Sequence, residues 1–256
     1  MNISRNNSDN PVPGIDVRDL DYYYGGLKVL ENIHLSVPRG SSAAVLGPSG
    51  CGKSTLLHIL AGLLSPEQGE VRFQGRSVLN RQGWISYMQQ DDLLLPWKTV
   101  ADNIALPLIL KGQKARDARR SVLNQLDQFG LEGFGSHFPE QLSGGMRQRA
   151  SFMRSCMFRQ DFFLLDEPFS RLDYLTRSRM HEWFQNYVEE HQPGYILVTH
   201  DPEEALLLAD EIILLSSRPA RIIQRFSVDA PRPRSRELIA REPMQEILRT
   251  IIAKAT

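Results

Sequence analysis

Short continuous apolar runs, separated by glycines and polar turns, recur along this chain. Four such runs are found, at residues 43–46, 162–165, 195–198 and 212–215. Uninterrupted apolar runs of this length are typical of strands buried on both faces, as in a parallel sheet. The first run leads into a Gly-rich loop, after which residues 54–64 predict a helix that ends near Gly62. Residues 174–190 predict a crossover helix, so the pattern favours an α/β fold.

Helical periodicity dominates the middle of the chain. Residues 101–110 and 114–129 have apolar side chains at helical spacing, which predicts two helices of an inserted lobe. Charged side chains lie on the opposite face of the second one, namely Lys114, Arg116, Asp117, Arg119 and Arg120. A strand is predicted at 84–88, ahead of this lobe. At the ends of the chain, residues 1–14 predict a disordered lead-in, and residues 231–256 predict a Pro/Arg-rich turn followed by a short amphipathic helix.

Composition narrows the classes of function. The 256 residues carry a formal net charge of zero, so no basic footprint for nucleic acid or for an anionic membrane is present. The two cysteines, Cys51 and Cys156, are expected to be free thiols in a reducing cytosol. No apolar stretch approaches the length that spans a bilayer, and the N-terminus lacks a signal-peptide pattern. We therefore expect a soluble chain whose membrane role, if any, comes through a partner.

The loop after the first strand fits the phosphate-binding pattern G-x-x-x-x-G-K-[ST]. Its residues are Gly47, Pro48, Ser49, Gly50, Cys51, Gly52, Lys53 and Ser54. Gly50 and Gly52 allow backbone N–H groups to approach a β-phosphate, and Lys53 is expected to reach the β/γ-phosphates. Ser54 is expected to bind Mg²⁺, and Thr55 to lie near the α-phosphate. A chance Gly-rich turn is the alternative, but the flanking strand and helix favour a nucleoside triphosphate site.

Two adjacent carboxylates, Asp166 and Glu167, end the second apolar run. Parallel strands deliver their C-terminal residues to the ligand crevice of the sheet. Asp166 is therefore expected to hold Mg²⁺ through water, and Glu167 to polarise the water that attacks the γ-phosphate. The alternative is a pair of acidic residues that merely solvate a strand end. The presence of a phosphate loop upstream favours the catalytic interpretation.

Residues 142–149, Leu-Ser-Gly-Gly-Met-Arg-Gln-Arg, resemble the signature of ATP-binding-cassette (ABC) ATPases. The resemblance extends over about residues 15–215 and implies a RecA-like P-loop NTPase core, an antiparallel β subdomain and an inserted α-helical signature subdomain. It implies an ATPase domain at 15–230, with its helical part at about 91–155. In that family the signature binds the γ-phosphate held by a second subunit. Ser143, Gly144 and Gly145 are thus expected to act on ATP in a homodimer.

The same resemblance assigns roles to further residues. His200 is expected to contact the γ-phosphate and orient Glu167, so that Glu167, His200 and Lys53 form the catalytic set. Gln90 is expected to bind Mg²⁺, with Gln89 as the fallback. The resemblance also places Tyr24 against the adenine ring, although one of the three consecutive tyrosines could serve packing instead. Asp173 matches the family's D-loop, where Arg171 replaces the usual alanine.

The resemblance implies an ATPase, with ATP and Mg²⁺ as cofactors, that drives separate permease subunits from the cytoplasmic face of the membrane. Residues 93–97 and the following helix are expected to form the groove for the permease. The segments 93–97, 216–222 and 228–234 resemble ATPases of nitrate/sulfonate/taurine-type importers, which act with a substrate-binding protein. Solvated arginines in an ordinary turn are the competing interpretation of the last segment. The ATPase of an exporter or lipid carrier is a second candidate function, and a soluble ABC ATPase that works on nucleic acid or ribosomes is a third.

Overall fold

The structure, a computed structural model, describes residues 13–79, 83, 85–158 and 161–255. Residues 13 and 14 of the predicted disordered lead-in belong to strand β1 (Pro13–Tyr24), so that part of the prediction is wrong, and the rest of it lies outside the described residues. Trp84, which opens the strand predicted at 84–88, also lies outside them. Within the described part of that segment, residues 86–88 form the short strand β6 (Ser86–Met88).

A six-stranded sheet forms the core. Its order is β10 (Ile222–Ser227), β9 (Glu211–Leu215), β3 (Ser42–Leu46), β8 (Gly194–Val198), β7 (Phe162–Asp166) and β6. All neighbours pair in parallel except β10, which is antiparallel to β9. Successive side chains of β3 enter opposite apolar clusters, with Ala43 and Val45 in one and Ala44 and Leu46 in the other. Burial on both faces explains why these strands lack polar alternation.

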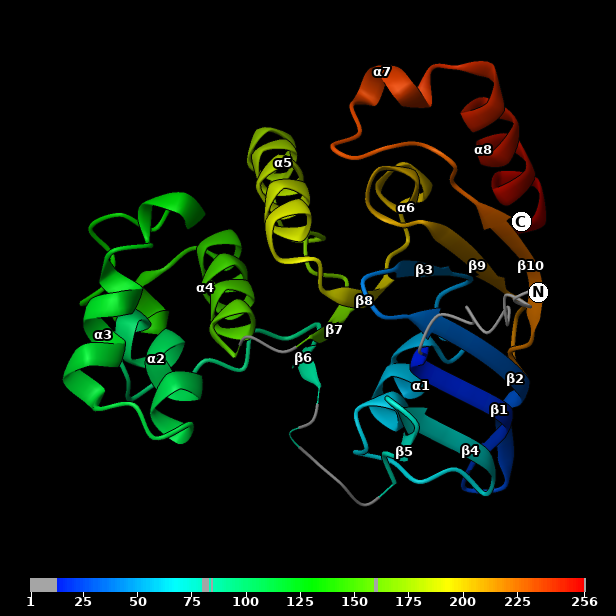
Figure 1. The fold of residues 1–256 in the computed structure, drawn as a ribbon, viewed down its shortest axis with the longest axis horizontal. Coiled ribbons are helices and arrows are strands. Elements are labelled where there is room, and N and C mark those ends of the chain that lie inside the picture. Colours follow the sequence, from blue (N-terminus) through cyan, green and yellow to red (C-terminus); the bar gives the residue numbers. More distant parts are fainter. Residues whose placement is uncertain (1–12, 80–82, 84, 159–160, 256) are drawn as a thin grey trace, which may run out of the picture.

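A four-stranded antiparallel sheet, the β lobe, covers one side of the core. Its order is β2 (Leu27–Pro38), β1, β4 (Gln68–Phe73) and β5 (Arg76–Ser77). Its apolar side chains share a cluster with those of helix α1 (Lys53–Leu60), which lies beside this lobe in Figure 1. Helix α1 ends at Leu60, just before the stop predicted near Gly62, which adopts a positive φ of 72°.

The helical lobe lies at the opposite end of the molecule (Figure 1). It contains α2 (Val100–Leu110), α3 (Ala115–Leu123), the 3₁₀ turns η1 (Asp127–Phe129) and η2 (Pro139–Gln141), and α4 (Gly144–Met157). Thr99 caps α2 by accepting a hydrogen bond from the backbone of Asp102 at 3.3 Å. The predicted helix at 114–129 is shorter than expected. Its last part forms η1, which places the ring of Phe129 against that of Trp183, with 4.2 Å between the ring centroids.

Helices α5 (Tyr174–His191) and α6 (Pro202–Leu208) cover the face of the core sheet opposite the β lobe. The chain then adds β10 at the edge of the sheet and ends in α7 (Arg236–Ile239) and α8 (Glu242–Ala255). Cys51 and Cys156 are both buried free thiols, as expected.

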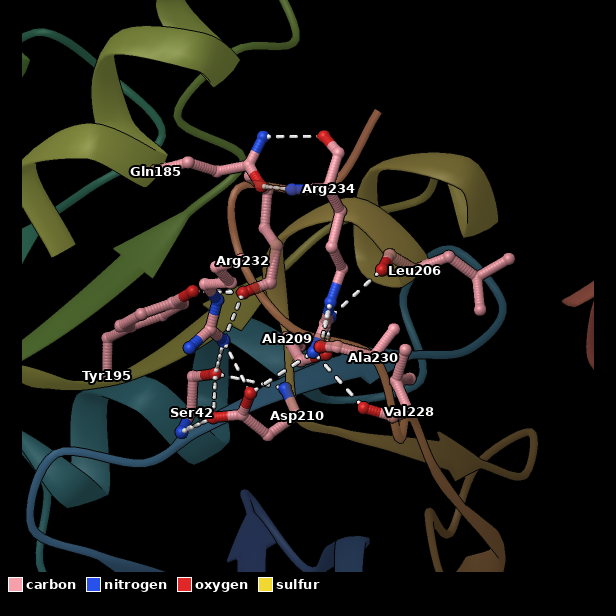
Figure 2. Close-up of polar contacts among 11 residues, drawn as sticks. Ser42, Gln185, Tyr195, Leu206, Ala209, Asp210, Val228, Ala230, Arg232 and Arg234 are labelled. Atoms are coloured by element: carbon pink, nitrogen blue, oxygen red, sulfur yellow. Dashed lines mark hydrogen bonds and ion pairs between the residues drawn. The ribbon is translucent and has the colours of Figure 1, made fainter. Parts of the chain in front are cut away.

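The Pro/Arg-rich segment between β10 and α7 is fastened into the core (Figure 2). The Arg234 side chain is 1% exposed and donates to the carbonyls of Leu206, Ala209, Val228 and Ala230. Both Arg234, at 3.3 Å, and Arg232, at 2.8 Å, contact the Asp210 carboxylate, which also accepts from the Ser42 backbone. The interpretation as solvated arginines is therefore wrong for these two.

We expect Arg234→Met to lower the free energy of unfolding by about 3–5 kcal/mol, because it removes the side-chain hydrogen bonds to four backbone carbonyls and leaves Asp210 with one partner fewer. Arg18→Met is the control, since Arg18 is an exposed side chain whose pairing with Asp16 is worth less than about 1 kcal/mol. Urea denaturation followed by tryptophan fluorescence measures both. Equal stabilities of the two variants would contradict the role assigned to Arg234.

Candidate functional site

The phosphate loop joins β3 to α1, in the strand–loop–helix context that the sequence predicts. The Lys53 amino group donates to the carbonyls of Gly47, at 2.7 Å, and Pro48, at 2.9 Å. These two hydrogen bonds hold the start of the loop against the Lys53 side chain. Gly52 has a φ of 128°, and a Cβ there would lie 2.9 Å from Val29 of the β lobe. Only glycine fits this position, and the helix that follows presents its N-terminal N–H groups to the loop.

Asp166 lies at the carboxyl end of β7 and is 3% exposed. Burial raises the pKa of its carboxyl above the usual value, although the hydrogen bond from Ser54 and the charge of Lys53 act in the opposite direction. A carboxylate and a hydroxyl held together in this way are hard oxygen ligands of the type that Mg²⁺ prefers. The residues present thus fit the predicted cation.

Glu167 sits at the centre of the predicted catalytic set. One of its carboxylate oxygens lies 3.4 Å from Nδ1 of His200, which follows β8, and 3.5 Å from Nε2 of Gln90, which follows β6. Gln89 instead lines a separate groove, so the geometry favours Gln90 of the two candidate glutamines. The structure therefore brings the ends of three parallel strands, β6, β7 and β8, to one place, as the parallel register requires.

The backbone of Glu167 is held in the left-handed region, with a φ of 48°. This conformation costs a non-glycine residue about 1–2 kcal/mol and persists only where the surroundings fix it. Here the Glu167 N–H donates to Val198 at 2.9 Å, and its carbonyl accepts from the hydroxyl of Ser170 at 3.0 Å. The turn directs the carboxylate toward His200.

The signature residues lie in a different part of the molecule. Ser143 caps α4 by accepting from the backbone of Met146 at 3.2 Å, and Gly144 opens that helix. Figure 1 shows α4 in the helical lobe and α1 beside the β lobe, so Ser143, Gly144 and Gly145 do not complete the phosphate loop of their own chain. A helix N-terminus of this length suits an anion supplied from elsewhere.

The D-loop connects β7 to α5. Asp173 caps α5, and hydrogen bonds from Thr176 hold the pKa of Asp173 below its usual value. Arg171, the departure from the family's alanine, pairs with Asp91 at 2.9 Å. Because Asp91 directly follows Gln90, this ion pair links the D-loop to the segment that carries the predicted Mg²⁺ glutamine.

Tyr24 is the most exposed of the three consecutive tyrosines, at 72%, whereas Tyr22 is buried in the core of the β lobe. It ends β1, and the strand β2 that follows packs Val29 against Gly52 of the phosphate loop. An exposed ring on this hairpin is free to stack on a base.

Two contacts of the site have no signal in the sequence. The Arg218 guanidinium donates to the carbonyl of Gly50 in the phosphate loop. Gln148 of α4 donates to the carbonyl of Glu167 at 2.9 Å. The partners are 168 residues apart in the first contact and 19 in the second. No periodic pattern in the sequence relates residues at these separations, so neither contact could be predicted.

A groove of about 280 Å³ lies between the core and the helical lobe. Its apolar lining includes Leu63, Ile85, Tyr87, Pro107 and Phe158. The helix expected to contribute, α2, does so through Pro107, but residues 93–97 are not part of the lining. Leu93 and Trp97 are exposed instead, at 52% and 71%. In the described part of the chain, no helix has the length and apolar character needed to cross a membrane.

This chain is similar in sequence to a known family and to named proteins of several bacteria. The family described as "ABC transporter" matches residues 30–170. The chain is 42% identical to the formylaminopyrimidine import ATP-binding protein ThiZ of Halalkalibacterium halodurans, over 77% of each chain. It is 41% identical to the aliphatic sulfonates import ATP-binding protein SsuB 2 of Burkholderia cenocepacia, over 88% of this chain and 82% of that one. It is also 41% identical to the taurine import ATP-binding protein TauB of Pseudomonas aeruginosa, over 80% and 78%.

A solved ATP-binding cassette, described as dimeric in a post-hydrolysis state with ADP and Pi bound, superimposes with a TM-score of 0.77. It is 27% identical, and the match covers 85% of this chain and all of that one. The expected fold class, a P-loop NTPase core with a β lobe and a helical lobe, is confirmed.

The left-handed backbone at Glu167 can be tested by comparing two truncations. We expect Glu167→Gly to be more stable than Glu167→Ala by about 1 kcal/mol, because glycine adopts a positive φ without strain.

Ser170, in the same loop and without a positive φ, is the control. There Ser170→Ala should be at least as stable as Ser170→Gly, since glycine costs about 0.5–1 kcal/mol at an ordinary position. Thermal unfolding of the four variants measures the two differences. The same sign at both positions would contradict the strained backbone.

Proposed function

The chain belongs to the ABC transporter family, and from this we propose that it is the ATP-hydrolysing subunit of an importer of the nitrate/sulfonate/taurine type. The observation that carries the proposal is the convergence of Gln90, Glu167 and His200 at the carboxyl edge of a sheet that also bears the phosphate loop. The similar proteins carry names for three different imported compounds, so we propose the class of importer and leave the imported compound open.

In this proposal each group acts on bound ATP in a defined way. Lys53 exchanges its two loop carbonyls for phosphate oxygens, and the backbone N–H groups after Gly50 and Gly52 hold the phosphates. Ser54, Asp166 and Gln90 would hold Mg²⁺, which neutralises phosphate charge when bound. Glu167 accepts a proton from the attacking water, and His200 holds the Glu167 carboxylate in position from 3.4 Å.

The signature requires a second copy. Ser143, Gly144 and Gly145 form a helix N-terminus whose first turn carries no acidic side chain, and the solved cassette similar to this chain is dimeric. We therefore place the signature of one copy against the γ-phosphate held by the other, with Asp173 near the same interface. ATP binding would close the dimer, and hydrolysis would reopen it.

The groove beside Pro107, together with exposed Leu93 and Trp97, is the proposed contact with integral-membrane permease subunits. A groove with several apolar side chains in its lining, and a large exposed aromatic side chain, are both typical of a protein interface. The chain would then act as a peripheral subunit at the cytoplasmic face, served indirectly by a substrate-binding protein. Exporters, lipid carriers and ATPases acting on nucleic acid are not favoured, because the similar proteins are named for import.

We expect Glu167→Gln to lower kcat for ATP by at least about 100-fold, because an amide cannot accept the proton of the attacking water. The same variant should accumulate as an ATP-bound dimer, which size-exclusion chromatography with and without ATP measures. Normal turnover by this variant would show that Glu167 is not the catalytic base.

Adding Ser143→Arg to that variant tests the action of the signature in the other copy. The bulky cation at the start of α4 should abolish the ATP-dependent dimer and leave ATP binding by the monomer intact. If binding by the monomer were lost equally, the signature would act in its own chain instead.

We expect Trp97→Glu to weaken co-purification with co-expressed permease subunits by about tenfold or more, since exposed aromatic side chains often dominate the affinity of an interface. Leu123→Glu is the control, because it places the same charge on an exposed apolar residue elsewhere in the helical lobe. Equal recovery of the permease with both variants would locate the contact elsewhere.

A further inference from the structure

Gln148 is a buried amide in the second turn of α4, the helix that the signature opens. Its side chain is 2% exposed, and both of its polar ends are used. The Nε2 group donates to the carbonyl of Glu167 at 2.9 Å, and the Oε1 atom accepts from the backbone N–H of Arg171 at 2.9 Å. One side chain thus joins the signature helix to the backbone of the predicted base and to that of the D-loop.

The bond to Glu167 acts on a strained backbone. Its other partners are Val198, which binds the Glu167 N–H, and Ser170, which binds the same carbonyl from within the D-loop. Gln148 is the partner that comes from the helical lobe. Because a φ of 48° is unfavourable for glutamate, the orientation of its carboxylate depends on these bonds.

The start of α4 also rests on the D-loop. A Cβ on Gly145 would lie 3.4 Å from the Leu172 side chain and 3.6 Å from the Arg171 carbonyl. A displacement of α4 therefore cannot leave the D-loop and the Glu167 backbone unchanged, because packing and two hydrogen bonds connect them.

We propose that Gln148 is a positioning residue, which fixes the Glu167 backbone according to where the signature helix lies. This inference rests on the proposed function, in which the signature of one copy binds the nucleotide of the other. Binding of that nucleotide sets the position of α4. Through the hydrogen bond of Gln148, the position of α4 then determines the backbone conformation of Glu167 in the same chain. The base at one ATP site is thereby oriented by the nucleotide at the other.

The chain supplies a matched control in Gln185 of α5. This side chain is 4% exposed and also bridges a backbone, donating to the carbonyl of Arg234 at 3.1 Å and accepting from the N–H of the same residue at 2.5 Å. It shares the chemistry and burial of Gln148, but its hydrogen bonds hold the C-terminal segment at Arg234 (Figure 2) and not the Glu167 backbone. A loss common to both glutamines reflects stability alone.

The test compares Gln148→Met with Gln185→Met, since methionine keeps the length of the side chain and loses both bonds. For Gln148→Met we expect kcat to fall at least about tenfold, because small misplacements of a catalytic group cost this much or more. The KM for ATP should stay within about twofold, since the bridge does not contact the phosphate loop. Gln185→Met should keep kcat within about twofold while losing thermal stability.

A second variant, Gln148→Glu, separates the two bonds and decides the question if the methionine variant does not fold. A carboxylate still accepts from Arg171 but cannot donate to the Glu167 carbonyl, so kcat should fall as in Gln148→Met. Wild-type kcat in either folded Gln148 variant, or a fall matched by Gln185→Met, would overturn the proposal. So would a rise in KM that accounts for the loss of kcat/KM.

Dimerisation separates this proposal from the proposed function. Combined with Glu167→Gln, Gln148→Met should still form the ATP-dependent dimer, because the bridge orients the base after the signature has docked. Loss of that dimer only when Gln148 is changed would overturn the positioning role. Failure of Glu167→Gln alone to dimerise would overturn the proposed function instead.

Discussion

Burial of the core sheet on both faces is the constraint on which the rest of the structure depends. Side chains of β3, β7, β8 and β9 alternate between two apolar clusters, so a shift of one residue would move every side chain of a strand into the opposite cluster and disrupt the close packing of both. The parallel register then fixes where the strands end. The paired ends of β7 and β8 therefore place three side chains together beside the phosphate loop, those of Asp166, Glu167 and His200.

Much of this could be predicted from the sequence, because the signals are local or periodic. The buried strands appear as uninterrupted apolar runs, and the phosphate loop appears as a spacing of glycines around Lys53. Choosing Gln90 over Gln89 needs only the count from the segment that follows, and the distance to Glu167 agrees with that choice. Helix ends are harder to predict, since the tertiary contact of Phe129 with Trp183 outweighs the helical periodicity of residues 114–129.

Other parts could not be predicted, because they depend on partners far away in the chain. Arg232 and Arg234 appear as solvated charges in a Pro-rich turn until Asp210 and a set of free carbonyls are seen to face them. Gln148 appears as an ordinary residue of the signature helix until the unusual backbone of Glu167 is known. Side chains that satisfy irregular backbone leave no pattern in a single sequence.

The fastening of the C-terminal segment has a consequence for biosynthesis. Ser42, Gln185 and Asp210 leave the ribosome before Arg232 and Arg234, yet their polar groups are satisfied in the native fold by those two residues. Until Arg232 and Arg234 have been translated, Ser42, Gln185 and Asp210 therefore lack the hydrogen bonds and ion pairs that these two arginines form with them. Domains fold as units during synthesis, so this core becomes complete only after Arg234 has been made. The residues predicted to act on ATP, all of which come before residue 201, therefore belong to a core that Arg232 and Arg234 complete.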